Sequence, residues 1–364
     1  DMKAIRLKTE YLTNPLGIDM KMPRLFWNCQ GGLTQTAYWI IAETDSRTVW
    51  DSGKVLSRQM AGIPYPQPLV SRQRVDWRVR LWDENDHPGE WSKTAFFEMG
   101  FLDSSDWRGK WITGNYRVDK KRRYPVDCFR RYVEISKDVR RARLYITACG
   151  LYEARVDGKK VGGFCLAPGH TDYRKRIQYQ TYDVTDLLTP GRHRAEIQLA
   201  DGWYRGSCGA WGLKNQYGTG TKLLAQIEIF YEDGCKDTLV TGSTWDWSND
   251  GPIRFADNKD GEIVEAFRIP SYGGKAKVTS CDVIPCASNN VPVTEHECFH
   301  PVITKVPDGK LLLDFGQNIA GYAAFSFNAE EGQQLTLRFG EMLDEAGNMT
   351  LKNIQCSNKK VTTP

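Results

Sequence analysis

Short runs of alternating apolar and polar residues, each closed by a turn signal, dominate this chain. Such runs occupy residues 38–42, 78–82 and 226–231. Asp157-Gly158 and Asp233-Gly234 are dipeptides that favour tight hairpin turns. Long stretches with the 3.6-residue period of an amphipathic helix are almost absent. Many short strands at close spacing are typical of sandwiches and barrels, so the sequence predicts an all-β protein.

The 364 residues are too many for one small sandwich, so we expect tandem β-sandwiches. Residues 1–100 contain W-R-V-R-L-W-D and a later W-S pair, typical of a fibronectin type III-like sandwich. Residues 106–285 have the strands and turns of a galactose-binding-like jelly roll, similar to a carbohydrate-binding module. Residues 287–364 begin a third β-sandwich but lead into a polar stretch without a closing strand. We therefore expect the third sandwich to be truncated.

The charge and hydropathy patterns argue against two classes of partner. A net charge of +4, evenly spread, is too weak to indicate nucleic-acid binding. No apolar run approaches the ~18 residues that a membrane span needs. The sequence opens with Asp1 rather than Met, so the lack of a signal peptide says little about the compartment. A periplasmic or secreted location and a cytoplasmic one both stay open.

Ten cysteines are scattered along the chain without a C-x-x-C pair, which argues against a zinc site. Cys149 and Cys165 lie among apolar residues, so we expect them to be small core side chains. The spacing of the cysteines shows no disulfide framework, which favours reduced thiols. The H-T-D segment at His170 is not part of a catalytic triad, because no G-x-S-x-G elbow is present.

Three blocks of sequence form the most specific motif pattern. The first runs from G-L-Y-E-A-R-V-D-G-K-K-V-G at residues 150–162 to D-G-W-Y-R-G at residues 201–206. The second is D-N-K-D-G-E at residues 257–262. The third combines D-F-G-Q-N-I-A-G at residues 314–321 with G-E-M-L-D-E-A-G-N-M at residues 340–349. In this order, the blocks resemble the N-terminal, non-catalytic part of bacterial α-L-rhamnosidases of glycoside hydrolase family 78, and the resemblance spans essentially the whole chain.

The resemblance implies a parent enzyme that hydrolyses terminal α-L-rhamnosyl residues from glycosides by inversion. In that family an (α/α)6 barrel follows the sandwiches and carries the catalytic acids near a D-x-x-x-x-D-E-R-x-G-W-type segment. This sequence contains no such segment. We therefore expect spacer and sugar-binding sandwiches without hydrolase activity, and we assign no catalytic residue here. The implied partners are L-rhamnose or a rhamnosyl-containing glycan and the missing C-terminal barrel.

Two other functions fit the same pattern. The chain is then either a stand-alone carbohydrate-binding or surface-adhesion protein, or a purely structural module between domains. A reading frame that continues into a helical barrel with paired acids favours the enzyme, and one that stops favours the stand-alone protein.

A glycoside hydrolase typically needs a pair of carboxyl groups for catalysis. An inverting enzyme holds two of them roughly 6.5–9.5 Å apart. Asp260 and Glu262, in the second block, are the nearest candidates by motif, and for them we expect a structural or ligand-holding role.

The D-G-W-Y-R-G segment is the best candidate for sugar binding. Its glycines permit a sharp turn, and the indole of Trp203 suits the apolar face of a 6-deoxy sugar. Asp201 and Arg205 are suited to fix the sugar by hydrogen bonds. Tyr204 belongs to the same segment, and Trp211 offers a second aromatic platform. The alternative is that these aromatic residues pack in the core.

A calcium ion is implied by the resemblance, because the family's jelly roll is similar to a rhamnose-binding module that uses calcium to hold sugar hydroxyls. Asp157 and Asp201 are the candidate ligands, together with loop carbonyls. Gly158 follows Asp157, so a second side-chain oxygen is absent at that turn. The alternative for Asp157 is a plain type I′ turn. No other cofactor is expected.

Overall fold

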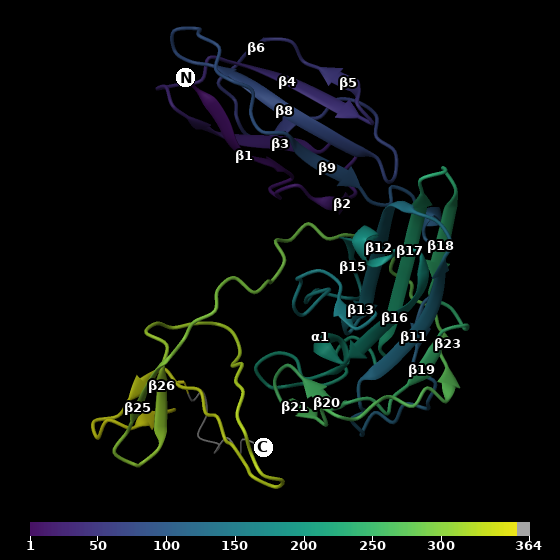
Figure 1. Cartoon of the computed structure of the whole chain (residues 1–364), viewed down its shortest axis with the longest axis vertical. Coiled ribbons are helices and arrows are strands. Elements are labelled where there is room, and N and C mark those ends of the chain that lie inside the picture. The colour runs from purple at the N-terminus through teal and green to yellow at the C-terminus, as the bar shows by residue number, and fades with distance from the viewer. Residues whose placement is uncertain (355–364) are drawn as a thin grey trace. The chain divides into compact units, whose positions relative to one another are not determined.

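The fold is all-β, as the sequence predicts, in a computed structural model that describes residues 1–354 (Figure 1). Within these residues, helical structure is limited to α1 (Gly202–Arg205) and the 3-10 turns η1 (Ser104–Asp106) and η2 (Thr185–Leu187). The chain forms two compact units, Asp1–Thr294 and Glu295–Pro364. The first unit contains two β-sandwiches. The boundaries 1–100, 106–285 and 287–364 remain predictions.

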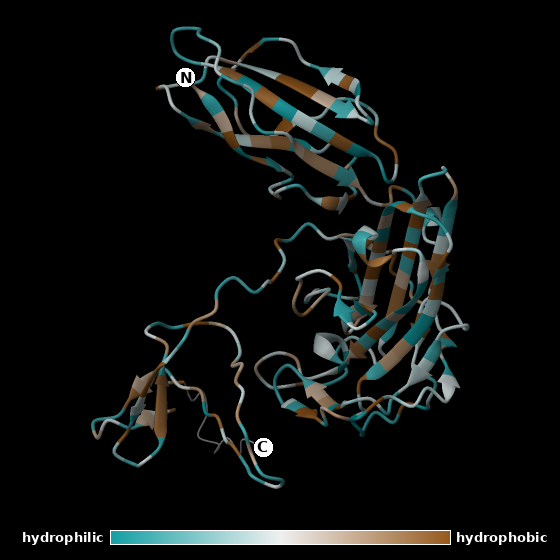
Figure 2. Ribbon diagram, viewed as in Figure 1, coloured by the Kyte–Doolittle hydropathy of each residue, from teal (hydrophilic) through white to brown (hydrophobic). Residues whose placement is uncertain are grey.

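The first sandwich combines a small and a larger sheet. The small sheet has the order β1 (Lys3–Thr9), β3 (Arg24–Gln30), β7 (Ile63–Pro64). The larger has the order β2 (Leu16–Ile18), β9 (Ala95–Met99), β8 (Arg74–Trp82), β4 (Ala37–Thr44), β5 (Arg47–Asp51), with β6 (Val55–Leu56) beside β4. Alternate residues of β8 are at most 1% exposed, and they are Val75, Trp77, Val79 and Leu81. This is the two-residue period visible along the long strands in Figure 2.

The second sandwich is built from two larger sheets. One has the order β23 (Lys277–Val278), β10 (Ile112–Thr113), β17 (Lys222–Tyr231), β12 (Val139–Cys149), β15 (Gln178–Asp183), β24 (Cys286–Ala287), with β18 (Lys236–Val240) beside β17. The other has the order β14 (Lys159–Lys160), β13 (Leu151–Val156), β16 (Gly191–Ala200), β11 (Asp127–Ile135), β19 (Asp246–Ser248), β22 (Gly274–Lys275). A separate hairpin joins β20 (Ile253–Asp257) to β21 (Gly261–Val264).

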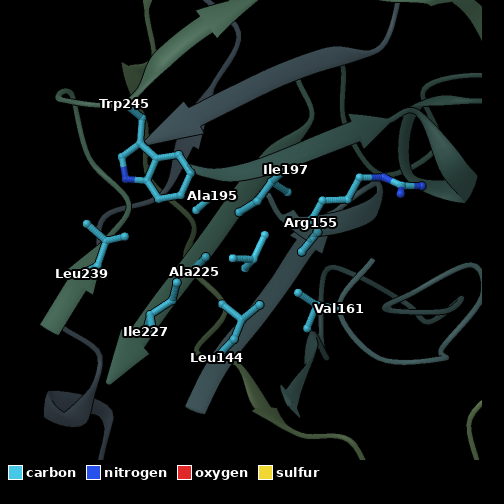
Figure 3. Close-up of a pocket in the computed structure, with 11 residues that line it drawn as sticks. Leu144, Arg155, Val161, Ala195, Ile197, Ala225, Ile227, Leu239 and Trp245 are labelled. Carbon is cyan, nitrogen blue, oxygen red and sulfur yellow. The ribbon is translucent and has the colours of Figure 1, made fainter. Parts of the chain in front are cut away.

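The interior between these two sheets is filled mainly by apolar side chains. Leu144 and Ile227 come from one sheet, and Ala195 and Ile197 come from the other (Figure 3). The cavity left among them is about 10 Å³, roughly the space for one water. A sugar does not fit there, so a binding site in this sandwich has to lie on its loops or outer faces.

Buried ion pairs join the two sandwiches of the first unit. Arg143 on β12 donates two hydrogen bonds to Glu98 on β9, at 2.7 and 3.0 Å. These side chains are 4% and 1% exposed. Arg72 pairs with Glu228 on β17 at 2.5 Å and with Asp106 at 2.9 Å. We call these two clusters the junction network.

The second unit is partial in the residues that the structure describes. It contains two hairpins, formed by β25 (Val302–Lys305) with β26 (Leu311–Asp314) and by β27 (Met342–Leu343) with β28 (Met349–Thr350). Large apolar side chains lie on its surface, including Tyr322, Phe325 and Phe339. These are residues that a completed sandwich would bury.

Candidate functional site

A buried ion pair anchors the short helix α1. Strand β16 ends at Ala200, and Gly202 then adopts φ +52° to start the helix. A Cβ on Gly202 would lie 2.6 Å from Leu151 Cγ, so the site needs glycine. Arg205 Nε donates to Asp201 Oδ1 at 2.8 Å, and both side chains are 7% exposed. Asp201 and Arg205, which the sequence predicted to bind sugar, therefore form a buried ion pair with each other.

Arg123 connects this pair to the β20–β21 hairpin. Its guanidinium lies 2.5 Å from Asp257, 3.3 Å from Asp260 and 3.6 Å from Asp201. Asp257 also accepts the backbone N–H groups of Ser207 and of Lys259. The loop after α1 is thus tied to the hairpin by charge-assisted hydrogen bonds.

Asp127 completes the group, which we call the loop network (Asp201, Arg205, Arg123, Asp257, Asp260, Asp127 and Tyr116). Arg205 Nη1 donates to the Tyr116 hydroxyl at 2.9 Å. Asp127 is fully buried and accepts from Trp247 Nε1 at 2.8 Å. Burial raises the pKa of Asp127 to about 6, and burial likewise raises the pKa of Tyr116 to about 12.

The aromatic residues of α1 pack with aromatic residues from neighbouring loops. The half-buried ring of Trp203 stacks on His170, with centroids 5.4 Å apart and planes at 17°. Tyr217 meets the same His170 ring at 6.1 Å in an edge contact. Tyr204 is 7% exposed and packs against Tyr173 in the core. Trp203, His170 and Tyr217 form what we call the aromatic platform.

The remaining predicted residues lie apart from this platform. Trp211 is 88% exposed on the loop after α1. Asp260 accepts from Ser207 Oγ at 2.8 Å, which gives it a structural contact, and Glu262 lies exposed on β21. His170 and Tyr217 were not predicted from the sequence, because no spacing rule links them to Trp203.

Asp157 and Asp201 lie at opposite ends of the pair formed by strands β13 and β16. Strands β13 and β16 are in register from Leu151–Ala200 to Val156–Ala195. Asp157 and Asp201 lie one residue beyond opposite ends of this ladder, so about seven steps separate them by roughly 23 Å. One calcium ion therefore cannot contact both carboxylates, and calcium at either alone remains a prediction.

Asp157 is held by its own partners. Its Oδ2 lies 2.6 Å from His193 Nδ1, and its Oδ1 accepts the Arg194 N–H at 2.8 Å. Burial opposes protonation of His193, but the bonds to Asp157 and to the Thr189 carbonyl outweigh burial and raise the pKa of His193. The pair borders an open depression of about 300 Å³, which is lined by Tyr132, Asp157, Arg192, His193 and Arg194. Asp157 and Gly158 both have positive φ, as a type I′ turn requires.

Nowhere in residues 1–354 do three or more His, Cys, Asp or Glu side chains gather in a way that could hold a metal ion. The carboxylates that do gather in the loop network surround Arg123 instead. None of the helices in this part of the chain has the length and apolar character to cross a bilayer.

Three family models match the sequence, one after another. The Rha78A-like N-terminal immunoglobulin domain matches residues 4–103. The alpha-L-rhamnosidase N-terminal domain matches residues 137–297. The bacterial alpha-L-rhamnosidase concanavalin-like domain matches residues 304–363.

Curated relatives agree with these models. An alpha-L-rhamnosidase of Formosa agariphila is 32% identical over 378 residues, covering 95% of this chain and 40% of its own length. One from Alteromonas sp. (strain LOR) is 33% identical over 367 residues, covering 92% of this chain and 40% of its own length. The chain thus spans about 40% of the length of these relatives.

Solved structures share the fold. The native rhamnosidase of Aspergillus terreus has a TM-score of 0.79 at 29% identity, over 88% of this chain and 39% of that chain. The alpha-L-rhamnosidase of Streptomyces avermitilis, complexed with L-rhamnose, has a TM-score of 0.81 at 24% identity, over 98% of this chain and 53% of that chain.

Proposed function

This chain belongs to the N-terminal region of the α-L-rhamnosidases of glycoside hydrolase family 78, and from that membership we propose that its parent protein hydrolyses terminal α-L-rhamnosyl residues from glycosides by inversion. The order of the three matched domains supports this proposal. Inversion requires an acid and a base on opposite faces of the scissile bond. We place that pair in the part of the relatives that lies beyond the matched 40%.

Within the described residues, we propose that the aromatic platform binds a rhamnosyl residue. The observation that carries this proposal is the stack of Trp203 on His170, which holds a half-buried indole in place on helix α1. A fixed aromatic ring loses little conformational entropy when an apolar sugar face packs on it. Asp201 and Arg205 serve by anchoring α1 rather than by contacting the sugar.

Titration calorimetry with L-rhamnose tests this role. Single-sugar sites are small and water competes for each hydroxyl, so we expect a Kd of roughly 0.1–1 mM, or about 4–5.5 kcal/mol. Trp203→Ala should lose about 1 kcal/mol or more of binding free energy. Trp91 is a half-buried tryptophan of the first sandwich, so Trp91→Ala is the matched control and should leave the affinity for L-rhamnose unchanged. Absence of heat with the wild-type chain at high sugar concentration would overturn the proposal.

Two further titrations with L-rhamnose test the roles of Trp211 and of calcium. Trp211→Ala should have a smaller effect than Trp203→Ala, because the Trp211 side chain is 88% exposed. If calcium holds sugar hydroxyls, a chelator should weaken binding, and if it does not, the calcium prediction fails while the platform stands.

Hydrolysis is tested separately. We expect this chain alone to release no sugar from an aryl α-L-rhamnoside. Turnover that survives repurification and is lost in Glu262→Gln would contradict this expectation. It would show that this chain contains catalytic residues.

A further inference from the structure

Two cysteines far apart in the sequence meet beside α1. Cys149 is the last residue of β12 and is 1% exposed, and Cys281 lies half-buried after β23. Lys222, the register partner of Cys149, donates to the carbonyl of Ser280, the residue before Cys281, and the two neighbouring thiols shift each other's pKa. Both belong to a small apolar cluster that also contains Tyr173 and Tyr204. Among the nine described cysteines, all of which are free thiols, this pair is therefore placed for mutual chemistry.

We propose that Cys149 and Cys281 are a modification site, which a small disulfide oxidant such as oxidised glutathione converts into an intramolecular disulfide. The inference does not depend on sugar binding or on hydrolysis. It concerns two thiols that the sequence pattern presents as isolated, because 132 positions separate them (281 − 149).

The surroundings give the two thiols different acidities: the pKa of Cys149 is raised and that of Cys281 is lowered. The neighbouring Cys149 thiol lowers the pKa of Cys281, and although burial opposes this, the Val283 N–H and the Lys222 ammonium add to it. Lys222 is the register partner of Cys149, and its Nζ donates to the Ser280 carbonyl at 2.6 Å, so its charge is held next to Cys281. Cys281 is therefore the nucleophile, and the more buried Cys149 is the resolving thiol.

The chemistry balances in two exchange steps. The Cys281 thiolate attacks one sulfur of the oxidant, forms a mixed disulfide and releases one thiolate. Cys149 gives its proton to a released thiolate and attacks the Cys281 sulfur, which expels the second thiolate. Two protein thiols are thereby oxidised by two electrons, and one oxidant disulfide is reduced to two thiols. Closing the disulfide brings the two sulfurs to about 2.05 Å.

The bond would join two parts of the second sandwich. It links the end of β12 to the segment after β23, which continues to β24. Tyr204 of α1 packs in the same cluster, so the link lies directly against the helix that carries Trp203. A crosslink between distant positions removes freedom from the unfolded chain, so oxidation should raise the melting temperature.

The test uses the full chain, reduced and then exposed to oxidised glutathione, quenched with an alkylating agent and mapped by mass spectrometry. We expect a linked pair of peptides containing Cys149 and Cys281, a mass loss of two hydrogens, and reversal by reductant. Cys149→Ser should instead accumulate a glutathione adduct on Cys281, and Cys281→Ser should give neither product. Cys128→Ser, which removes another buried cysteine, should form the link as wild type does.

Several outcomes would overturn the inference. They are a stable glutathione adduct on wild-type Cys281, a link through other cysteines, or a melting temperature that oxidation leaves unchanged. If a serine variant fails to fold, the pH dependence of Cys281 alkylation in the wild-type chain decides instead. A Cys281 that alkylates no faster at neutral pH than exposed Cys235 would contradict the thiolate role.

Discussion

The junction network and the loop network each surround buried carboxylates, but their charges are balanced differently. At the junction, each carboxylate meets an arginine, as Glu98 meets Arg143 and Glu228 meets Arg72. In the loop network, Asp127 is held by the neutral donors Trp247 and Thr221. The junction is therefore built for ionised carboxylates, whereas the loop network contains one carboxyl that favours its proton.

This difference gives Glu228 and Asp127 opposite dependence on pH. Burial favours a raised pKa for Glu228, but hydrogen bonds and charge from Arg72 outweigh burial and lower it. Burial raises the pKa of Asp127 to about 6. A lowered carboxyl pKa contributes stability that is lost on acidification, and a raised one costs stability as the pH rises. The junction should thus weaken in acid, whereas the contribution of Asp127 to the loop network should be lost as the pH rises from 3.8 to about 6.

The largest effect is expected from breaking the junction. Arg143→Met leaves the Glu98 carboxylate, 1% exposed, without its principal partner. Breaking a buried pair on one side costs about 3–5 kcal/mol, so urea unfolding at pH 7 should show a loss of that size. Lys3→Met removes one partner of the exposed Lys3–Glu90 pair and should cost less than about 1 kcal/mol. Equal losses in the two variants would mean that burial does not set the strength of the junction.

Asp127→Asn should give a smaller effect of the opposite sign. The Asp127 pKa rises from 3.8 to about 6, and each pKa unit corresponds to about 1.4 kcal/mol. Ionised Asp127 therefore costs on the order of 3 kcal/mol at pH 8 and nothing below pH 3.8. The asparagine keeps an acceptor for Trp247, so the variant should be more stable than wild type at pH 8, with a gain that disappears near pH 4.

Glu228→Gln is the matched comparison for Asp127→Asn. It removes charged hydrogen bonds from Arg72 and should lose about 1.5–3 kcal/mol at pH 7. That loss should shrink as the pH falls below the ordinary value of 4.5 and through the lowered pKa of Glu228. Unfolding curves for both variants at several pH values measure the two slopes. Slopes of the same sign would contradict the contrast between the networks.

The sequence reveals the fold more completely than the site, for a physical reason. Strand alternation and turn dipeptides are local, so the all-β architecture and the Asp157-Gly158 turn followed from residue patterns. Strand register is not local, and the pattern therefore did not show that Asp157 and Asp201 lie at opposite ends of one ladder. A residue type also does not reveal which way its side chain points.

The D-G-W-Y-R-G segment illustrates that last limit. The sequence favoured Asp201 and Arg205 as outward-facing sugar ligands, but four residues of helix place them together in the interior. Trp203 was singled out for its indole, yet the His170 ring that braces it is 33 positions away and had no motif to mark it (203 − 170). Contacts between distant segments require the tertiary structure.

Asp157→Asn should have the smallest effect on stability, because the Asp157–His193 pair is only partly buried. The Asp157 side chain is 46% exposed and the His193 side chain is 10% exposed, so water screens the pair and its loss should cost less than about 1 kcal/mol. The raised His193 pKa means that this contribution is full below the ordinary value of 6.5 and is lost as the pH rises through the folded value. NMR titration of His193 should show a lower pKa in the variant than in the wild-type chain. An unaltered His193 titration would show that the Thr189 carbonyl, rather than Asp157, holds the imidazolium.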